Sequence, residues 1–172
     1  MERVNEIVKE FQNNNYDSFE EFYELTSKIL YVIINDIVKN TSDSEDIMQD
    51  TYMKFLKNID KCSTSWSPQA YLMKIGKNNA INFYNKKKHE LVDSDVIDQI
   101  SAPEENDSAV DLGILDLLNQ EQREIVELHI VGNLKFREIS DIVDKPLGTV
   151  LWIYNKAIKY LRKEVSKNYE NK

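Results

Sequence analysis

The stretch LKFREISDIVDKPLGTVLWIYNKAIKYLRK, residues 134–163, holds two apolar patterns of helical spacing on either side of a proline. Residues of the first pattern that share one predicted buried face are Phe136, Ile139, Ile142 and Val143. Pro146 has no N–H and restricts the residue before it, so this helix is predicted to end near Asp144. A second helix is predicted from about Leu147, and its inner face consists of Val150, Tyr154, Ala157, Ile158 and Leu161.

Two helices this short need a third helix against which to bury their apolar faces. The stretch LLNQEQREIVELHIV, residues 117–131, supplies one, with Leu118, Ile125, Leu128 and Val131 available for the interior. Three helices in this order are the plan of a helix-turn-helix, whose second helix enters the major groove of DNA. A three-helix bundle without a ligand fits the same pattern, and the pattern alone does not decide between them.

The rest of the chain also predicts helices. Glycine and proline are few in the 172 residues, and strand-like alternation is absent, so we expect an all-α protein. Predicted helices cover about 1–11, 19–38, 44–59 and 68–87. Asp17 and Ser18 can cap the second of these, Ser42 and Glu45 have capping-box spacing for the third, and Ser67-Pro68 marks the start of the fourth.

Several classes of protein are disfavoured by composition. Cys62 is the only cysteine, which precludes an internal disulfide and favours the reducing cytoplasm. The chain start is not a secretory signal, and the longest apolar run, Ile29–Ile34, is too short to insert into a membrane. Neither histidine has metal-site spacing and no glycine-rich phosphate loop is present, so we expect no metal, no cofactor and no enzymatic activity.

Charge is distributed unevenly over the chain, whose net charge is −8. Residues 61–88 carry six basic and no acidic side chains, whereas residues 89–118 carry nine acidic and no basic ones. From residue 145 onward, seven basic side chains stand against two acidic ones. Two basic patches in an acidic chain suggest two contacts with a polyanion. The acidic stretch 89–116 is predicted to be a flexible linker between a helical domain, 1–88, and the helix-turn-helix domain, 117–172.

Two helix faces of the first domain are candidate sites. Asp46, Gln49, Asp50 and Met53 lie at i, i+3, i+4 and i+7 and form an acidic and amide ridge opposite the apolar face. For a generic helix such a ridge is simply a solvated face. The predicted helix 68–87 presents Lys74, Lys77, Asn78, Asn82 and Asn85, and it ends in Lys86, Lys87 and Lys88.

Three runs together resemble the sigma-70 family of bacterial RNA polymerase sigma factors, in the small extracytoplasmic-function type. These runs are DSEDIMQDTYMKFL (43–56), AYLMKIGKNNAINFYNKKK (70–88) and LNQEQREIVELHIVGNLKFREISDIVDKPLGTVLWIYNKAIKYLRK (118–163). The resemblance implies a dissociable, non-enzymatic transcription initiation factor that binds core RNA polymerase and directs it to specific promoters. It also implies that the first domain corresponds to region 2 and the second to region 4.

Roles for the first domain follow from this resemblance. The ridge Asp46, Gln49, Asp50 and Met53 matches the surface that docks on the coiled coil of the polymerase β′ clamp. The helix 70–88 and the loop before it match the part that grips the downstream promoter element and holds its strands open. Opening requires a basic groove for phosphates and aromatic or amide groups for unstacked bases. The implied DNA-binding residues are Trp66, Lys74, Lys77, Asn78, Asn82, Tyr84, Asn85, Lys86, Lys87 and Lys88. An equally weighted alternative is that Trp66 packs from its loop onto the core of the first domain and does not contact DNA.

The second domain is expected to bind the upstream promoter element, and the flap of the polymerase β subunit through its outer surface. Implied contacts of the recognition helix are Thr149, Trp152, Asn155, Lys156, Lys159 and Arg162. Many members of the family carry Ser-Arg where this chain has Trp152-Ile153, and the missing arginine is a side chain suited to guanine or phosphate. Trp152 then contacts a thymine methyl or the sugar backbone, or Trp152 and Ile153 form an apolar patch for a protein.

The patch keeps a rival function open, namely a degenerate sigma-like regulator that binds polymerase or another protein without directing promoter recognition. An autonomous helix-turn-helix repressor is a third possibility, against which the acidic balance counts. The sequence also leaves open whether an anti-sigma factor is a partner, and which promoters are recognised.

Overall fold

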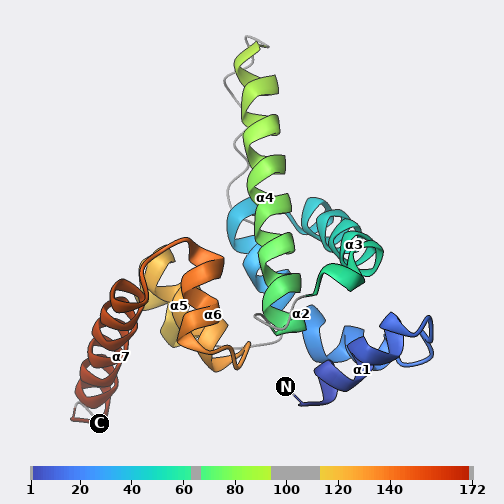
Figure 1. Cartoon of the computed structure of the whole chain (residues 1–172). Helices are drawn as coiled ribbons and strands as arrows, with labels where there is room; N and C mark the ends of the chain where they lie inside the picture. Colours follow the sequence, from blue (N-terminus) through green and yellow to red (C-terminus); the bar gives the residue numbers. More distant parts are fainter. Residues whose placement is uncertain (1, 63–66, 94–112, 171–172) are drawn as a thin grey trace. The chain divides into compact units, whose positions relative to one another are not determined.

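The computed structural model describes residues 2–62, 67–93 and 113–170. In these ranges every regular element is a helix, so the predicted all-α class is confirmed. The chain forms two compact units, with α1 to α4 in the first and η2 to α7 in the second (Figure 1). The domain limits at residues 88 and 117 remain predictions, because residues 94–112 lie outside the described ranges.

The first unit is built around three helices that pack against one another in pairs. They are α2 (Phe19–Val38), α3 (Thr41–Lys57) and α4 (Pro68–Asp93), while α1 (Glu2–Gln12) and the short 3-10 helix η1 (Ile59–Lys61) pack at their side. Phe22 of α2 is fully buried, and its ring centroid lies 5.4 Å from Phe11, 6.0 Å from Tyr52 and 5.3 Å from Phe55. This aromatic cluster therefore joins α1, α2 and α3 in one core.

Helix α4 lies close against α2 at Gly76, a buried residue that the sequence does not mark as important. A Cβ added there would collide with Cδ1 of Leu30 and would lie 3.5 Å from both Ile34 Cδ1 and Thr51 Cγ2. The absence of a side chain at Gly76 thus allows the two helices to meet.

Sequence signals at helix ends give mixed results. Ser67 Oγ accepts a hydrogen bond of 3.2 Å from the Ala70 backbone N–H, which confirms the predicted start of α4 at Pro68. The predicted capping box of Ser42 and Glu45 is wrong, because α3 begins three residues earlier than expected. Its N-cap is Asn40, whose Oδ1 accepts from the Asp43 N–H at 2.9 Å. Helix α4 also continues to Asp93, past its predicted end at residue 87.

Burial raises the pKa of titratable groups of the first unit, among them Tyr52 and Cys62. The Tyr52 hydroxyl lies 2.8 Å from Thr26 Oγ1, which itself donates to the Phe22 carbonyl at 2.7 Å, and burial raises the pKa of Tyr52. Burial also raises the pKa of the Cys62 thiol to about 11. Because the thiolate is the nucleophilic form, Cys62 is a poor nucleophile at neutral pH.

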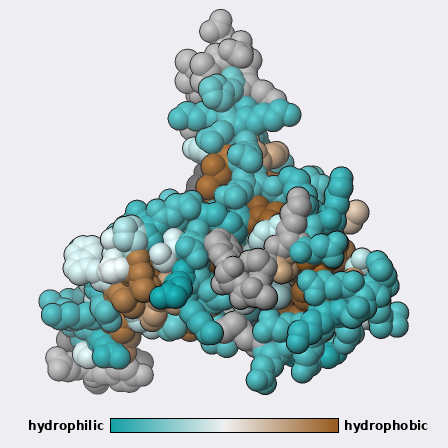
Figure 2. Space-filling view, in the orientation of Figure 1, coloured by the Kyte–Doolittle hydropathy of each residue, from teal (hydrophilic) through white to brown (hydrophobic). Residues whose placement is uncertain are grey.

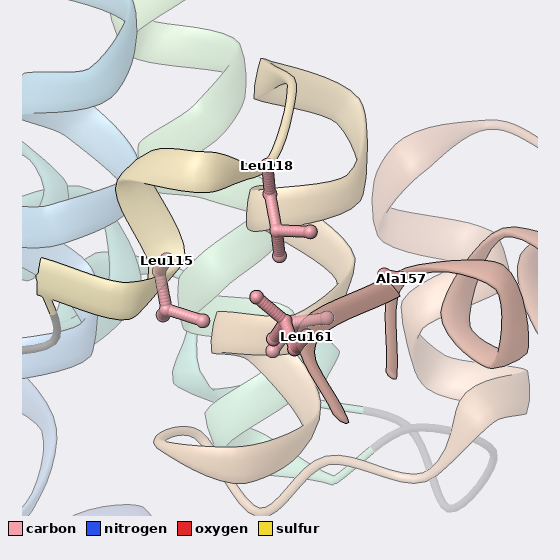
Figure 3. Packing of buried hydrophobic residues seen from close by; sticks show 5 residues of the cluster. Leu115, Leu118, Ala157 and Leu161 are labelled. Atoms are coloured by element: carbon pink, nitrogen blue, oxygen red, sulfur yellow. The ribbon is translucent and has the colours of Figure 1, made fainter. Parts of the chain in front are cut away.

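The second unit consists of η2 (Gly113–Leu117), α5 (Gln120–Ile130), α6 (Phe136–Val143) and α7 (Leu147–Glu170). Helix α7 packs on both α5 and α6 and also contacts η2. One group of buried residues at the η2 end of this unit comprises Leu115, Leu118, Val126, Ala157 and Leu161 (Figure 3). Leu115 belongs to η2, so part of the range that the sequence assigns to a linker contributes to this core.

The predicted helix, turn and helix of residues 134–163 are confirmed. Helix α6 ends at Val143, and Asp144 adopts the left-handed conformation with φ 53°. The Lys145 N–H donates to the Ser140 carbonyl at 3.1 Å, while Ser140 Oγ donates back to the Lys145 carbonyl at 2.5 Å. These two bonds close the turn, and α7 begins at Leu147 directly after Pro146.

A small aromatic cluster fixes α7 against the other two helices. The His129 ring stacks on Phe136 at 4.2 Å between centroids and meets Tyr154 edge-on at 5.0 Å, and Phe136 lies 4.9 Å from Tyr154. His129 Nδ1 also lies 2.9 Å from the Leu134 carbonyl oxygen. One residue from each of α5, α6 and α7 thus meets at this point, which orients α7 on the unit.

Candidate functional site

The acidic ridge of α3 is exposed along its whole length. Asp46, Gln49, Asp50 and Met53 all face solvent, and the Met53 side chain is the most exposed large apolar residue of the described chain at 69%. The opposite face of the helix is buried through Ile47, Met48, Thr51, Tyr52 and Phe55. Within the described residues, the carboxylates of Asp46 and Asp50 form no ion pair, so their charge is available to a basic partner.

One residue next to the ridge is engaged inside the unit. Asp43, in the first turn of α3, accepts an ion pair of 2.8 Å from Lys87 of α4. The ammonium of Lys87 also lies 5.7 Å from the centroid of the Phe83 ring. This contact connects the helix of the acidic ridge with the helix that carries the first basic patch.

The exposed face of α4 is polar and long. Asn78, Asn82 and Asn85 are exposed at i, i+4 and i+7, and the part of α4 that extends beyond α2 and α3 in Figure 1 is largely hydrophilic in Figure 2. Tyr84 is 50% exposed, as a residue that stacks on a base must be. The lysines Lys86, Lys87 and Lys88 are exposed, whereas Lys74 and Lys77 are half-buried.

Two α4 residues were missed by sequence reasoning, and one predicted residue is not described. Asn79 looks like another asparagine of the strip, yet it binds α3: its amide donates to Thr51 Oγ1 at 3.0 Å and its Oδ1 accepts from Lys54 Nζ at 2.7 Å. Ile81 is an exposed apolar residue three positions after Asn78, so the polar strip includes an aliphatic side chain. Trp66 lies outside the described residues.

Helix α7 presents the second basic face. Thr149, Trp152, Asn155, Lys156, Lys159 and Arg162 are all exposed, as predicted. Trp152 is 61% exposed, and the ammonium of Lys156 lies 4.8 Å from the centroid of its ring. Because Trp152 and Lys156 are four positions apart, they are neighbours on one face of the helix.

The suggested apolar patch of Trp152 and Ile153 is wrong. Ile153 is only 3% exposed and lies in the core of its own unit, so it offers no surface to a partner. Its burial follows from the packing of α7 on two helices, α5 and α6, which widens the buried arc beyond the stripe that the sequence pattern marks. Trp152 is therefore exposed without Ile153 beside it.

No helix in the described ranges is both long and apolar enough to cross a membrane. Likewise, no three potential metal ligands of the His, Cys, Asp or Glu type are grouped together among these residues.

Comparison with known proteins gives two family matches. The Sigma-70 region 2 model matches residues 22–90, and the Sigma-70, region 4 model matches residues 114–163, so together they cover more than half of the chain. The first match contains α3 with its ridge and most of α4. The second contains η2, α5, α6 and most of α7.

Curated relatives match this chain over most of its length and of their own. The ECF RNA polymerase sigma factor SigW of Bacillus subtilis is 24% identical over 182 residues, which cover 94% of this chain and 96% of SigW. The ECF RNA polymerase sigma factor SigK of Mycobacterium ulcerans is 24% identical over 173 residues, covering 92% and 91%. The RNA polymerase sigma factor SigV of Bacillus subtilis is 29% identical over 140 residues, covering 80% and 84%.

Solved structures agree in fold. The sigma factor RpoE from Bartonella quintana, determined in complex with the anti-sigma factor NepR, matches with a TM-score of 0.63 and 22% identity over 86% of this chain and 96% of that one. CnrH, determined in complex with the cytosolic domain of CnrY, matches with a TM-score of 0.61 and 17% identity over 95% and 98%.

Proposed function

Because this chain belongs to the sigma-70 family, in its extracytoplasmic-function type, we propose that it performs its promoter-directing function through three separate surfaces. The ridge Asp46, Gln49, Asp50 and Met53 binds the coiled coil of the polymerase β′ clamp. The strip of α4 grips the downstream promoter element and stabilises its open strands, and the outer face of α7 binds the upstream element in the major groove. The function needs no catalysis by this chain and no cofactor.

The observation that carries this proposal is the pair of exposed faces on α4 and α7, each within a unit matched by a sigma-70 region. On α4 the amides are exposed at a helical period next to lysines, which suits contact with bases and phosphates together. On α7 the lysines and Arg162 follow the side chains of the first turns. The first turns of a recognition helix are the part that contacts base edges. The net charge of −8 disfavours tight DNA binding by the free protein and makes recruitment by polymerase necessary.

The rival function, a degenerate regulator, loses its support when Ile153 is buried, because the proposed two-residue protein patch no longer exists. For partners beyond polymerase and promoter DNA, we propose an anti-sigma factor. Its support is that RpoE and CnrH, which share the fold, were determined with NepR and with the cytosolic domain of CnrY. We place the protein in the cytoplasm, where polymerase and promoter DNA are found.

The proposed function is tested by reconstitution. The purified chain is added to core RNA polymerase, binding is measured, and transcription from genomic fragments is compared with that of core polymerase alone. We expect stable binding and discrete new start sites. Stable binding without new start sites would instead identify the degenerate regulator, and no binding would refute both functions.

The role of α4 gives a separate prediction. In the variant with Asn78→Ala and Asn82→Ala, we expect strand opening at a promoter to fall roughly 30-fold, since each lost base contact is worth at least about 1 kcal/mol. Opening is measured by the permanganate reactivity of unpaired thymines, and affinity for core polymerase should be unchanged. On a promoter with a preformed mismatch bubble, the variant should recover most of its activity.

A suitable control is Asn5→Ala on α1, which changes an exposed asparagine of the same unit outside α4. It should open the promoter like the unaltered protein. Equal opening by the α4 double variant would remove these two amides from the downstream interface, and an equal loss on the mismatched promoter would show that they act before strand opening.

A further inference from the structure

We propose that Trp152 selects thymine in the upstream promoter element by packing its indole on the thymine C5 methyl group, while Lys156 directs its ammonium to the adjoining phosphate. The inference rests on the proposed promoter function and adds the base and the chemical group that α7 recognises. It follows from three observations on the second unit, namely the isolation of Trp152, its place on α7 and its contact with Lys156.

Trp152 is not needed for packing of the unit. The core side of α7 is provided by other residues, among them Val150, Ile153 and Ala157, all of which are buried. Trp152 is 61% exposed on the opposite side and is not part of the buried leucine-rich group or of the His129 cluster. A large aromatic surface left in water is suited to a partner that covers it.

The position on the helix is that of a base contact. Helix α7 starts at Leu147, so Trp152 stands in its second turn, and residues near the N-terminus of a recognition helix contact base edges. Thr149 precedes it by three positions and Lys156 follows by four, which places the three on one face. The residues further along this face, Lys159 and Lys163, are cationic and exposed, and suit the phosphate backbone.

The chemistry of an indole singles out thymine. In the major groove, guanine, adenine and cytosine present polar edges, and the apolar group on offer is the C5 methyl of thymine. Indole has one N–H donor and no acceptor, so it cannot form the bidentate bonds by which Arg reads guanine or Asn reads adenine. Its apolar face can cover a methyl group and exclude water from it.

Lys156 complements this contact. Its ammonium already lies 4.8 Å from the centroid of the Trp152 ring in the free chain, a cation–π distance. The two side chains therefore restrict each other before DNA arrives, which reduces the conformational entropy lost on binding. With the indole on a base, the ammonium is held at the edge of the groove where a phosphate oxygen can accept from it.

The test uses polymerase reconstituted with the full chain and a promoter identified by its start site. Each thymine of the upstream element is replaced in turn by deoxyuridine, which removes only the methyl group. For the unaltered protein, we expect one position at which promoter binding weakens about fourfold, the value for losing burial of one methyl group. With Trp152→Ala the same replacement should have no effect, and placing 5-methylcytosine instead of cytosine at that position should strengthen binding by the unaltered protein only.

Controls separate this inference from the proposed function. Lys156→Ala should weaken binding to the thymine and deoxyuridine promoters by the same factor, since a phosphate contact carries no base information. Because Trp152 is exposed, Trp152→Ala should melt at the same temperature as the unaltered chain. Normal transcription that is insensitive to every deoxyuridine, or equally sensitive with Trp152→Ala, overturns the inference and leaves the promoter function intact, whereas failure to transcribe overturns that function.

Discussion

Reversing the charge of the ridge with Asp46→Lys and Asp50→Lys is expected to weaken binding to core polymerase by at least about 100-fold, because each removed acidic contact with a desolvated basic partner is worth roughly 2 kcal/mol or more. Both carboxylates are exposed on α3 without an ion pair among the described residues, so they have no competing partner within the unit. Repulsion between the new lysines and a basic coiled coil adds to the loss. The measurement is the dissociation constant for core polymerase at two ionic strengths, and the attraction in the unaltered protein should weaken as salt rises.

The matched control reverses two exposed acidic residues of α2, Glu20→Lys and Glu24→Lys, which have the same i, i+4 spacing and change net charge equally. This variant should bind polymerase within about threefold of the unaltered protein, the range of small surface effects. Both variants should unfold at nearly the same temperature as the unaltered protein, because surface substitutions rarely change stability by more than about 0.5 kcal/mol. Equal losses in the two variants would indicate a general charge effect and exclude a docking role for the ridge.

Gly76→Val is expected to destabilise the first unit by about 3 kcal/mol, the upper part of the range for overpacking a well-filled core. The added side chain would have to occupy space already filled by Leu30, Ile34 and Thr51, and Leu30 is itself fully buried, so its side chain would have to repack within the core. Chemical denaturation followed by far-ultraviolet circular dichroism measures the change.

Gly148→Val is the matched control. Gly148 also lies in a helix, but nothing lies within 4 Å of an added Cβ there. Since valine has a somewhat higher helix propensity than glycine, the second unit should be unchanged or stabilised by up to roughly 0.5 kcal/mol. Unchanged stability with Gly76→Val would mean that α2 and α4 can move apart, in which case their close approach is not a requirement of the fold.

Local signals explain most of what the sequence predicts correctly. The helix, turn and helix around Pro146 are set by one residue that cannot continue a helix and by apolar spacings within a few turns, and these act over short distances. The same holds for the start of α4 at Ser67-Pro68 and for the exposed ridge of α3. Capping is less certain because several residues near one helix start can accept the same N–H bonds, and Asn40 takes the place predicted for Ser42.

Features that depend on contacts between distant residues were missed. Asn79 is one of several asparagines on α4, and only the approach of Thr51 and Lys54 from α3 makes it part of the interior contact. Gly76 is distinguished from Gly148 by its neighbours on other helices, Leu30, Ile34 and Thr51. The prediction of an outward Ile153 assumes a single buried face on this helix. Helix α7 packs against two helices, α5 and α6, and so buries a wider arc. Most candidate site residues that the structure describes are exposed as the sequence predicts, whereas Lys74 and Lys77 are half-buried and Ile153 is buried.

The ion pair between Asp43 and Lys87 joins the helix of the proposed polymerase contact to the helix of the proposed downstream DNA contact. Under the proposed function, polymerase docks beside Asp43 and DNA binds beside Lys87, so a partner that favours the paired or the separated state changes the affinity for the other partner. If docking to polymerase changes the affinity of the chain for DNA by some factor, binding of DNA must change the affinity of the chain for polymerase by the same factor. The ion pair is partly exposed, so this factor is at most about fivefold. It is measured as the ratio of DNA affinities with and without polymerase, which should equal the ratio of polymerase affinities with and without DNA. Under the proposed function, a promoter that draws Lys87 away from Asp43 therefore alters how firmly the chain remains bound to polymerase.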